Sequence, residues 1–290
     1  MLDAPRPSAP PPIRVDGTDM SFGTKTYVMG IINVTDDSFS GDGLMGDAHT
    51  AAAQAASFVS AGADLLDVGA ESTRPGSRAV PCDEQLARVL PAIAAIRQRT
   101  SVPISIDTTE PEVARQAIEA GAGMINDVNG LRTEGMAQVA AQVGAPVIIM
   151  HMQGTPRTMQ ADPRYGDVVE DILAFLDERI QVGLAGGIAE TQIIIDPGFG
   201  FGKTAGHNLE ILRRLSEFRA LGRPILMGTS RKSTIGKVLD LPAQERIFGT
   251  AATCAVAIHN GADIIRVHDV GAMAQVARMT DAILHGWEEA

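Results

Sequence analysis

Eight short apolar runs in this 290-residue chain each end at residues that can hydrogen-bond or carry a charge. In chain order these ends carry Asn33, Asp67 with Glu71, Asp107, Asn126 with Asp127, His151, Asp196, Ser230 with Arg231 and Lys232, and Arg266 with His268. The acids and amides of the middle runs could accept N–H groups from a nitrogen heterocycle, and the cations of the last two could hold an anion. If the run ends meet at one opening, they form a site for a polar ligand.

A glycine-rich segment follows one of these ends, in the sequence IIIDPGFGFGKT (193–204). A phosphate-binding P-loop requires G-x-x-x-x-G-K-[ST], but Pro197 occupies the place of the first glycine and has no N–H to offer a phosphate. The dinucleotide pattern G-x-G-x-x-G fails as well, because Lys203 stands where its last glycine is required. Both nucleotide-binding interpretations are therefore rejected, and Asp196 remains as a carboxylate at the end of a buried strand.

The elements that carry these residues are separated by a recurring junction, in which Gly-Ala follows an amphipathic segment and an apolar run begins. Glycine can adopt the left-handed conformation that closes a helix, and apolar runs without alternation are typical of parallel strands buried on both faces. We therefore interpret the junction as a helix-to-strand connection. It occurs in SAGADLLDVG (60–69), EAGAGMINDV (119–128), QVGAPVIIMH (142–151) and HNGADIIRVH (259–268).

Eight strands are predicted, at 27–33, 64–69, 103–107, 123–127, 146–151, 192–196, 224–228 and 263–267, with segments between them that are long enough for helices. This pattern predicts an α/β fold of the (β/α)8 TIM-barrel class in a single domain, with an open doubly wound sheet as the second alternative. In such barrels the C-terminal ends of the strands carry the active site. A lone polar residue at a strand end usually has a structural role, which is our interpretation of Asp67 and Asp127, while His151 is left between the two roles.

Three segments beyond the strand ends could complete a site. GTSRKSTIG (228–236) is predicted to pass from a strand into a helix, so Ser230 and the N–H groups after it could bind an anion. The segments 34–46 and 70–82 are rich in small residues, with Phe39 and Arg74 among them. They are either solvated loops or lids that shield the site from water.

Composition excludes several classes of protein. A net charge of −11, a pI near 5.0 and 4% aromatic residues disfavour nucleic-acid binding. Two cysteines, Cys82 and Cys254, form no disulfide framework and no metal-ligand spacing, which favours a cytoplasmic location. No apolar stretch approaches the roughly 20 residues of a membrane span. Residues 1–22 are proline-rich and are interpreted as a disordered tail, which leaves 23–290 as the barrel domain.

Eight motifs taken together resemble those of the dihydropteroate synthase family, from about residue 27 to about residue 280: GIINVTDDSFS, ESTRPGS, SIDTT, GMINDV, VIIMHMQGTP, IIIDPGFGFGKT, TSRKSTIG and IIRVHDV. The resemblance implies a cytoplasmic transferase of folate biosynthesis with a TIM-barrel fold. Such an enzyme condenses 6-hydroxymethyl-7,8-dihydropterin pyrophosphate with p-aminobenzoate, giving 7,8-dihydropteroate and pyrophosphate. The resemblance further implies a homodimer and a requirement for Mg²⁺, in a family that is a target of sulfonamides.

The resemblance also assigns roles to residues. It places the pterin against Asp107, Asn126, Met150, Asp196, Lys232 and Arg266. It places p-aminobenzoate against Phe39, Thr73, Arg74, Pro75, Phe201 and Ser230, and the pyrophosphate against Asn33, Arg74, Arg266 and His268. Asn33 is the implied ligand of Mg²⁺, and Asn33, Asp107, Lys232, Arg266 and His268 are the implied catalytic residues.

The chain departs from the family pattern in its first long segment, where Asp36 replaces a proline and Gly41-Asp42-Gly43 reorders the end of the motif. Because this departure adds an acid near an anion site, it bears on turnover and p-aminobenzoate affinity more than on pterin binding. Two other functions stay as alternatives. One is a pterin-binding module that presents methyltetrahydrofolate to a corrinoid protein, which should lack both the Ser-Arg-Lys and the Arg-x-His groups. The other is a non-catalytic paralogue.

Overall fold

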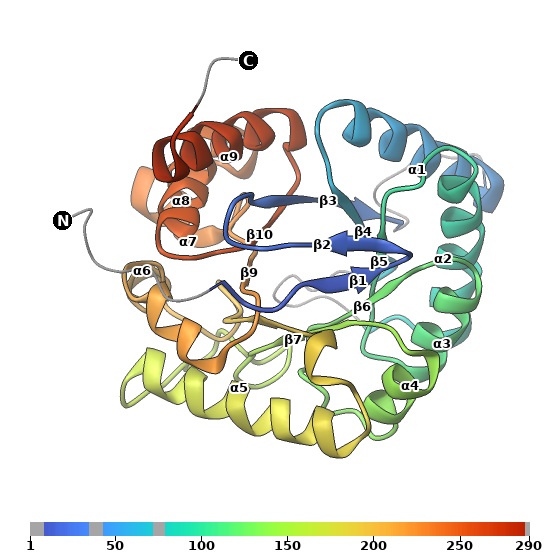
Figure 1. The fold of residues 1–290 in the computed structure, drawn as a ribbon, viewed down its shortest axis with the longest axis horizontal. Helices are drawn as coiled ribbons and strands as arrows, with labels where there is room; N and C mark the ends of the chain where they lie inside the picture. Colours follow the sequence, from blue (N-terminus) through green and yellow to red (C-terminus); the bar gives the residue numbers. More distant parts are fainter. Residues whose placement is uncertain (1–8, 35–42, 72–78, 288–290) are drawn as a thin grey trace.

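The computed structural model of the chain describes residues 9–34, 43–71 and 79–287, in which strands alternate with helices (Figure 1). The strands are β1 (Ile13–Val15), β2 (Thr18–Met20), β3 (Tyr27–Asn33), β4 (Leu65–Gly69), β5 (Ile104–Asp107), β6 (Met124–Asp127), β7 (Val147–Met150), β8 (Ile193–Asp196), β9 (Leu226–Met227) and β10 (Ile264–Val267). The α-helices are α1 (Gly43–Ser60), α2 (Cys82–Arg97), α3 (Pro111–Glu119), α4 (Met136–Val143), α5 (Val168–Ala185), α6 (Ala205–Arg213), α7 (Ser233–Leu239), α8 (Ile247–His259) and α9 (Val270–His285). Short 3₁₀ helices lie at Glu190–Gln192, Leu215–Leu221 and Ala243–Glu245.

Eight of the strands form one parallel sheet in the order β8-β7-β6-β5-β4-β3-β10-β9. The two ends of this sheet meet, because the N–H of Ile195 on β8 donates to the carbonyl of Pro224, 2.9 Å away, and Ile195 forms a parallel bridge with Ile225 ahead of β9. Helices surround the sheet in Figure 1. The predicted TIM barrel is confirmed, and every predicted strand lies within two residues of an observed one.

The Gly-Ala junctions form the predicted helix-to-strand connections. Gly62, Gly121, Gly144 and Gly261 have φ angles of 103°, 114°, 66° and 106°. Residues with a Cβ are strained in this region, so glycine is required where each helix turns back toward the sheet.

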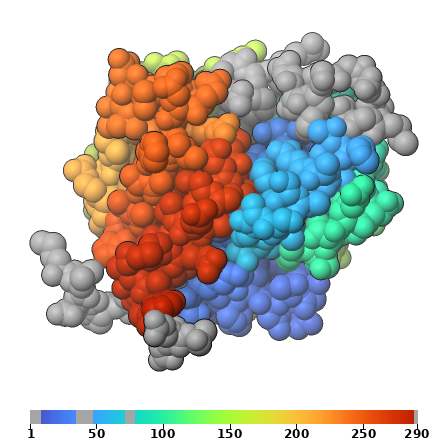
Figure 2. Space-filling view, turned by 90° about the horizontal axis from the view of Figure 1, so that it is seen from above, coloured from blue at the N-terminus to red at the C-terminus, as the bar shows by residue number. Residues whose placement is uncertain are grey.

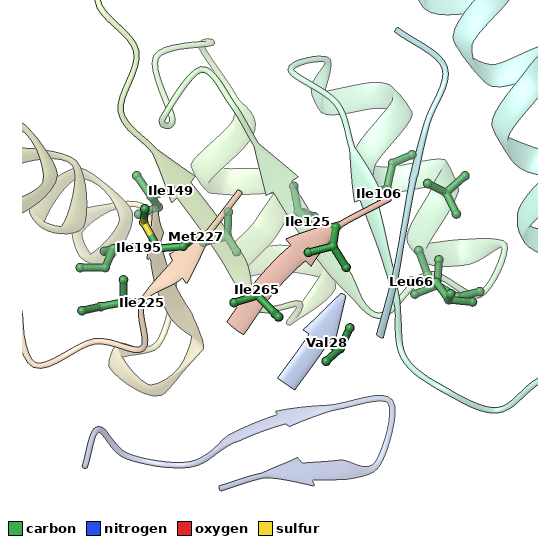
Figure 3. Close-up of a cluster of buried hydrophobic side chains, with 14 of the residues drawn as sticks. Val28, Leu66, Ile106, Ile125, Ile149, Ile195, Ile225, Met227 and Ile265 are labelled. Carbon is green, nitrogen blue, oxygen red and sulfur yellow. The ribbon is translucent and has the colours of Figure 1, made fainter. Parts of the chain in front are cut away.

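Two apolar layers alternate along the strands of the barrel, except on β5, where the polar Ser105 lies between Ile104 and Ile106 of the outer layer. One lies between the strands and the surrounding helices, and Figure 3 shows part of it: Val28, Leu66, Ile106, Ile125, Ile149, Ile195, Ile225, Met227 and Ile265. The other fills the inside of the barrel near the start of the strands: Met29, Leu65, Met124, Ile148, Ile194, Leu226 and Ile264. Because successive side chains of a strand point to opposite faces, a residue two positions further along also faces inward.

Because inward side chains recur every two residues, the inner layer changes from apolar to polar residues toward the C-terminal ends of four strands. Leu65 is followed two positions later by Asp67, Met124 by Asn126, Ile194 by Asp196, and Ile264 by Arg266. The inside of the barrel is therefore apolar at its lower end and polar at its C-terminal mouth. The strands need no irregularity to bring these polar groups together.

The lower end of the barrel is closed by the β1–β2 hairpin, which crosses the centre of the ring of helices in Figure 1. Both residues of its turn, Asp16 and Gly17, have positive φ angles, as the type I′ turn of a two-residue hairpin requires. Asp16 also forms an ion pair with Arg97 at the end of α2. The inward side chains of the hairpin pack on the inner apolar layer and are 1% exposed: Ile13, Val15 and Met20.

The hairpin corrects the predicted boundary between tail and domain. The proline-rich composition predicts a disordered tail over residues 1–22, but residues 13–20 of this segment pair as an antiparallel hairpin and belong to the barrel core. The signal was the Asp16-Gly17 turn after the alternating run Ile13-Arg14-Val15, next to a run of prolines that is typical of a disordered tail. The structured domain therefore begins before residue 23.

We predict that Met20→Ala destabilises the whole barrel although Met20 is far from the polar mouth. The change removes a buried side chain that seals the inner layer, and the expected loss is about 2 kcal/mol in the free energy of unfolding, measured by urea denaturation. The exposed neighbour Thr18 on the same strand supplies the control variant Thr18→Ala, for which little change is expected. Equal stabilities for the two variants would show that the hairpin does not contribute to the core.

Candidate active site

Arg266 is the centre of a charged cluster inside the mouth. Its Nε donates to Oδ2 of Asp67, 2.6 Å away, and its Nη2 donates to Oδ2 of Asp107, 2.8 Å away. Nδ2 of Asn126 donates to the same Asp67 oxygen, 3.1 Å away. Strands β10, β4, β5 and β6 thus each contribute one side chain, and the arrangement brings together three of the predicted site residues.

Asp67 is the residue of this cluster that sequence reasoning missed. Its side chain is fully buried, and its other carboxylate oxygen, Oδ1, has no hydrogen-bond partner among the described residues. The available signal was a charged residue in the interior of the apolar strand Leu65–Gly69, because a buried charge needs a paired partner. The partner comes from Arg266, 199 positions later in the chain, so the structural role assigned to Asp67 from sequence consists in holding a side chain of the mouth.

Burial controls the protonation of the acids at the mouth. It raises the pKa of Asp107 to about 7, although Arg266 acts in the opposite direction. It raises the pKa of Asp196 to about 6, opposed by the N–H of Gly198, which donates to Oδ1 of Asp196 over 2.7 Å, and by Lys232. Both carboxylates are therefore close to their titration range at neutral pH, and a ligand that donates N–H groups would favour their ionised form.

Lys232 lies at the start of α7, after β9, between the strands that carry Asp196 and Arg266. Burial and the neighbouring charge of Arg266 lower its pKa to about 8, while Asp196 acts in the opposite direction. Its Nζ lies 3.9 Å from the centre of the Phe201 ring, so the cation rests on an aromatic face. Asp196, Lys232 and Phe201 thus form one continuous wall.

His268 and Ser230 come from the last two strand ends and contact each other. The backbone N–H of His268 donates to Oγ of Ser230 over 3.2 Å, and Nδ1 of His268 lies 3.0 Å from the same oxygen. Burial, with Arg266 and Arg231 nearby, lowers the pKa of His268 to about 4, so the ring is neutral at neutral pH. With the Ser230 hydroxyl donating to Nδ1, Nε2 carries the remaining hydrogen and can donate to an anion.

An apolar cluster lies beside the charged groups. Met150, the last residue of β7, is 2% exposed and packs with Phe201, which is 7% exposed. The other members are Val128, Met152 and Met159. A flat heterocycle entering the mouth would therefore meet acids along its edge and apolar side chains at its face.

Two strand-end residues turn away from the mouth. Asp127 accepts the backbone N–H groups of Asn129 and Leu131, at 2.8 and 2.7 Å, so it holds the β6–α4 connection as predicted. His151 contacts Nζ of Lys203 through Nδ1 at 2.9 Å and packs edge-on against Phe175. His151, left between two roles by the sequence, therefore has a structural one.

The remaining predicted residues are only partly covered. Asn33 is the last residue of β3 and is half-buried beside Gly69 of β4. Phe39, Thr73, Arg74 and Pro75, together with Asp36, lie outside the described residues. Within the described ranges, the residues implied for the pterin and the pyrophosphate lie at or just beyond the C-terminal ends of the parallel strands, with Lys232 at the start of α7.

Known proteins resemble the chain over almost its whole length. The profile of a family described as pterin binding enzyme matches residues 29–268. The dihydropteroate synthase of Synechocystis sp. is 50% identical over 276 residues, which is 94% of this chain and 96% of the relative. Solved dihydropteroate synthases from Yersinia pestis, with a sulfonamide drug, and Xanthomonas albilineans, with 4-aminobenzoic acid, have TM-scores of 0.87 and 0.88. Both are 41% identical and cover 94% of this chain and 98% of their own.

The raised pKa of Asp196 predicts that Asp196→Asn stabilises the fold. The folded carboxyl binds its proton more tightly than the unfolded one, whose pKa is near 3.9, so the free energy of unfolding falls as the pH rises from about 4 to 6. At pH 7.5 the ionised group is destabilising. The uncharged amide can still accept the N–H of Gly198, so we expect the free energy of unfolding to rise by on the order of 1 kcal/mol.

The measurement is calorimetric melting of wild type and Asp196→Asn at pH 7.5 and pH 5. The melting temperature of the variant should exceed that of wild type at pH 7.5, and the gap should shrink at pH 5. Asp177→Asn, at an exposed position of α5, is the control for loss of one negative charge. A variant that melts below wild type at pH 7.5 would contradict the electrostatic assignment.

Proposed function

The chain belongs to the family of pterin-binding enzymes that includes the dihydropteroate synthases, and on this premise we propose the roles of its residues in that reaction. The enzyme is a transferase: it condenses 6-hydroxymethyl-7,8-dihydropterin pyrophosphate with p-aminobenzoate and yields 7,8-dihydropteroate and pyrophosphate. The observation that supports the proposed roles is the buried cluster of acids, amide and cations at one barrel mouth.

The pterin is proposed to bind deep in the mouth. Asp196 would accept N–H groups from the amidine-like edge of the ring, and Asp107 and Asn126 would contact its other polar atoms. A carboxylate that faces two N–H groups can accept both, and each charge-assisted bond contributes roughly 1.5–3 kcal/mol. Met150 would pack on the ring face, consistent with its place in the apolar cluster.

The pyrophosphate is proposed to lie toward Arg266 and His268. Two N–H groups of Arg266 are used by Asp67 and Asp107, which fixes the guanidinium plane and leaves its other donors for the anion. His268 would donate from Nε2, because Ser230 engages Nδ1. Arg74 is proposed to contact the same group from the second long segment.

Mg²⁺ is the proposed cofactor, with Asn33 as its protein ligand. Among the residues that the structure describes, no group of three His, Cys, Asp or Glu side chains could hold a metal alone. One amide oxygen at the mouth suits Mg²⁺, because this ion keeps several waters and takes oxygens from substrate phosphates. When bound, the ion would neutralise charge on the pyrophosphate.

p-Aminobenzoate is proposed to bind nearer the opening, between Phe201 and the residues Phe39, Thr73, Arg74 and Pro75. Its carboxylate would meet Ser230 and the N–H groups that follow it. The Ser230 hydroxyl is already held by His268, so contact with the carboxylate would require it to exchange that partner. This assignment therefore stays a prediction.

The proposed mechanism begins with departure of the pyrophosphate, which leaves a cation on the methylene carbon that the electron-rich pterin ring stabilises. The aniline nitrogen of p-aminobenzoate then attacks this carbon and loses one proton to solvent, which gives the neutral amine of 7,8-dihydropteroate. The chain's own contribution is to position both substrates, to place Arg266 and His268 against the departing negative charge and to keep water away from the cation. No side-chain nucleophile is needed.

A cytoplasmic homodimer is the proposed state of the enzyme. Among the described residues no helix is long and apolar enough to cross a membrane. Three exposed apolar side chains lie on α7 and α8, which pack closely at Gly249, and we call them the α7–α8 patch: Val238, Leu239 and Phe248, which is 83% exposed. In Figure 2 the orange and red helices form a continuous surface. Such a patch is typical of an interface between subunits.

The proposed function predicts release of pyrophosphate that depends on both the pterin pyrophosphate and p-aminobenzoate. Asp196→Asn should weaken pterin binding at least about tenfold, roughly 1.4 kcal/mol, because the amide cannot accept two N–H groups. Calorimetry with the pterin measures this affinity, and Asp177→Asn again serves as control. Unchanged affinity would contradict the anchor role of Asp196, and tight binding of methyltetrahydrofolate without pyrophosphate release would favour the corrinoid methyltransferase alternative.

The proposed dimer predicts that Phe248→Asp weakens self-association at least about thirtyfold, since a buried aromatic anchor typically contributes 2 kcal/mol or more. Sedimentation analysis across a concentration series measures the dissociation constant. Met279→Asp, at another exposed apolar residue on α9, is the matched control. A monomeric wild type would contradict the dimer, and a Phe248→Asp variant that associates like wild type would show that the α7–α8 patch is not its interface.

A further inference from the structure

A buried lysine in the loop between β8 and α6 takes no part in the proposed chemistry. Lys203 is 3% exposed, and its Nζ donates to the carbonyls of Gly198 and Phe201 over 2.9 and 3.0 Å. Nζ also lies 2.9 Å from Nδ1 of His151. Two carbonyls and an imidazole nitrogen match the three N–H groups of an ammonium ion, a form whose pKa burial lowers and the nearby carboxylate of Asp196 raises.

His151 is suited to be the third acceptor. Burial, and then the charge of Lys203, lower the pKa of His151 to about 2, so its ring is neutral and Nδ1 can accept a hydrogen bond. The ring is also fixed by packing, with its centre 4.8 Å from that of Phe175 in an edge-on arrangement. Lys203 is therefore held by a rigid neighbour rather than by its own loop alone.

The loop itself has little intrinsic preference for its conformation. Gly198, Gly200 and Gly202 have φ angles of 71°, 87° and 62°, and glycine reaches these values but loses much conformational freedom when it is fixed there. A Cβ on Gly198 would lie 1.8 Å from the carbonyl oxygen of His151, so the loop packs directly on the end of β7. Side-chain contacts must hold such a loop in one conformation.

This conformation places two groups in the site. The N–H of Gly198 donates to Oδ1 of Asp196 over 2.7 Å, which orients that carboxylate. The ring of Phe201 lies beside Nζ of Lys232 at 3.9 Å. Gly198 and Phe201, which provide these two groups, are also the residues whose carbonyls Lys203 binds. The lysine therefore lies directly behind the surface that the substrates would contact.

We propose that Lys203 is a positioning residue, which holds the carbonyls of Gly198 and Phe201 and thereby sets Asp196 and the Phe201 ring for substrate recognition. The proposal rests on the proposed function, since that assigns Asp196 to the pterin and Phe201 to p-aminobenzoate. It also gives the Gly-Lys-Thr sequence a role without a phosphate. The lysine binds carbonyls of its own loop, where a P-loop lysine would bind its ligand.

The test is steady-state kinetics of Lys203→Met, which keeps the apolar stem and removes the three donors. We expect KM for p-aminobenzoate to rise at least about tenfold, or roughly 1.4 kcal/mol, with a smaller fall in kcat. Pterin affinity, measured by calorimetry without p-aminobenzoate, should also fall. Lys25→Met, at an exposed lysine before β3, is the matched control and should keep wild-type constants.

All constants are measured well below the melting temperature of each protein, so that a loss of stability alone leaves KM unchanged. A folded Lys203→Met enzyme with wild-type KM and pterin affinity would overturn the proposal. Wild-type protein that releases no pyrophosphate would instead contradict the proposed function. In that case calorimetric affinities for the two substrates decide, and equal values for wild type and Lys203→Met overturn the positioning role.

A second variant covers the case in which Lys203→Met does not fold. The hydroxyl of Tyr165 donates to the carbonyl of Gly202 over 2.7 Å and is another tie on the same loop. Tyr165→Phe keeps the ring and removes only this tie. We expect a smaller rise in KM for p-aminobenzoate, and less than additive effects when both changes are combined. Wild-type KM in Tyr165→Phe, with Lys203→Met unfolded, would overturn the proposal.

Discussion

The structure of the site depends on one ionic interaction, the guanidinium of Arg266 held between the carboxylates of Asp67 and Asp107 inside the barrel. Two acids buried this close to each other would be costly without a cation, and a buried cation would be equally costly without the acids. The two acids and the cation therefore offset the cost of burying one another. The same contacts fix the orientation of every group, including Asn126, before any ligand arrives. A preorganised site of this kind spends less of its binding energy on ordering side chains.

The barrel supplies this cluster through simple alternation along its strands. Inward positions of β4, β6, β8 and β10 are apolar near the hairpin and polar two residues later, so the polarity of the interior changes over a distance of about 7 Å along these strands. The apolar side chains that stabilise the barrel and the polar side chains proposed to bind the substrates thus lie at different levels of the same interior. The lower level can be closely packed because it needs no opening, and the upper level can hold charge because the lower one keeps the strands in place.

Local sequence signals were sufficient for the fold but only partly for the site. Gly-Ala junctions and unalternated apolar runs located each of the eight barrel strands within two residues, since both signals come from short-range backbone requirements. The charge on Asp67 could be read as structural because its partner Arg266 lies 199 residues away and is brought near only by closure of the sheet. The role of Lys203 was hidden for a similar reason, because its acceptors are backbone carbonyls, which every residue has. The hairpin at residues 13–20 was obscured by neighbouring prolines.

The hairpin that closes the lower end has a practical consequence for handling the protein. Residue 9, where the described chain begins, lies beside Gly23 at the end of the barrel opposite the mouth. A surface linker joined on the N-terminal side would hold the molecule with its opening toward the solution. Immobilised in this orientation, the protein should capture small ligands from flow as freely as it does unattached, which makes sensor-chip or bead formats natural for it.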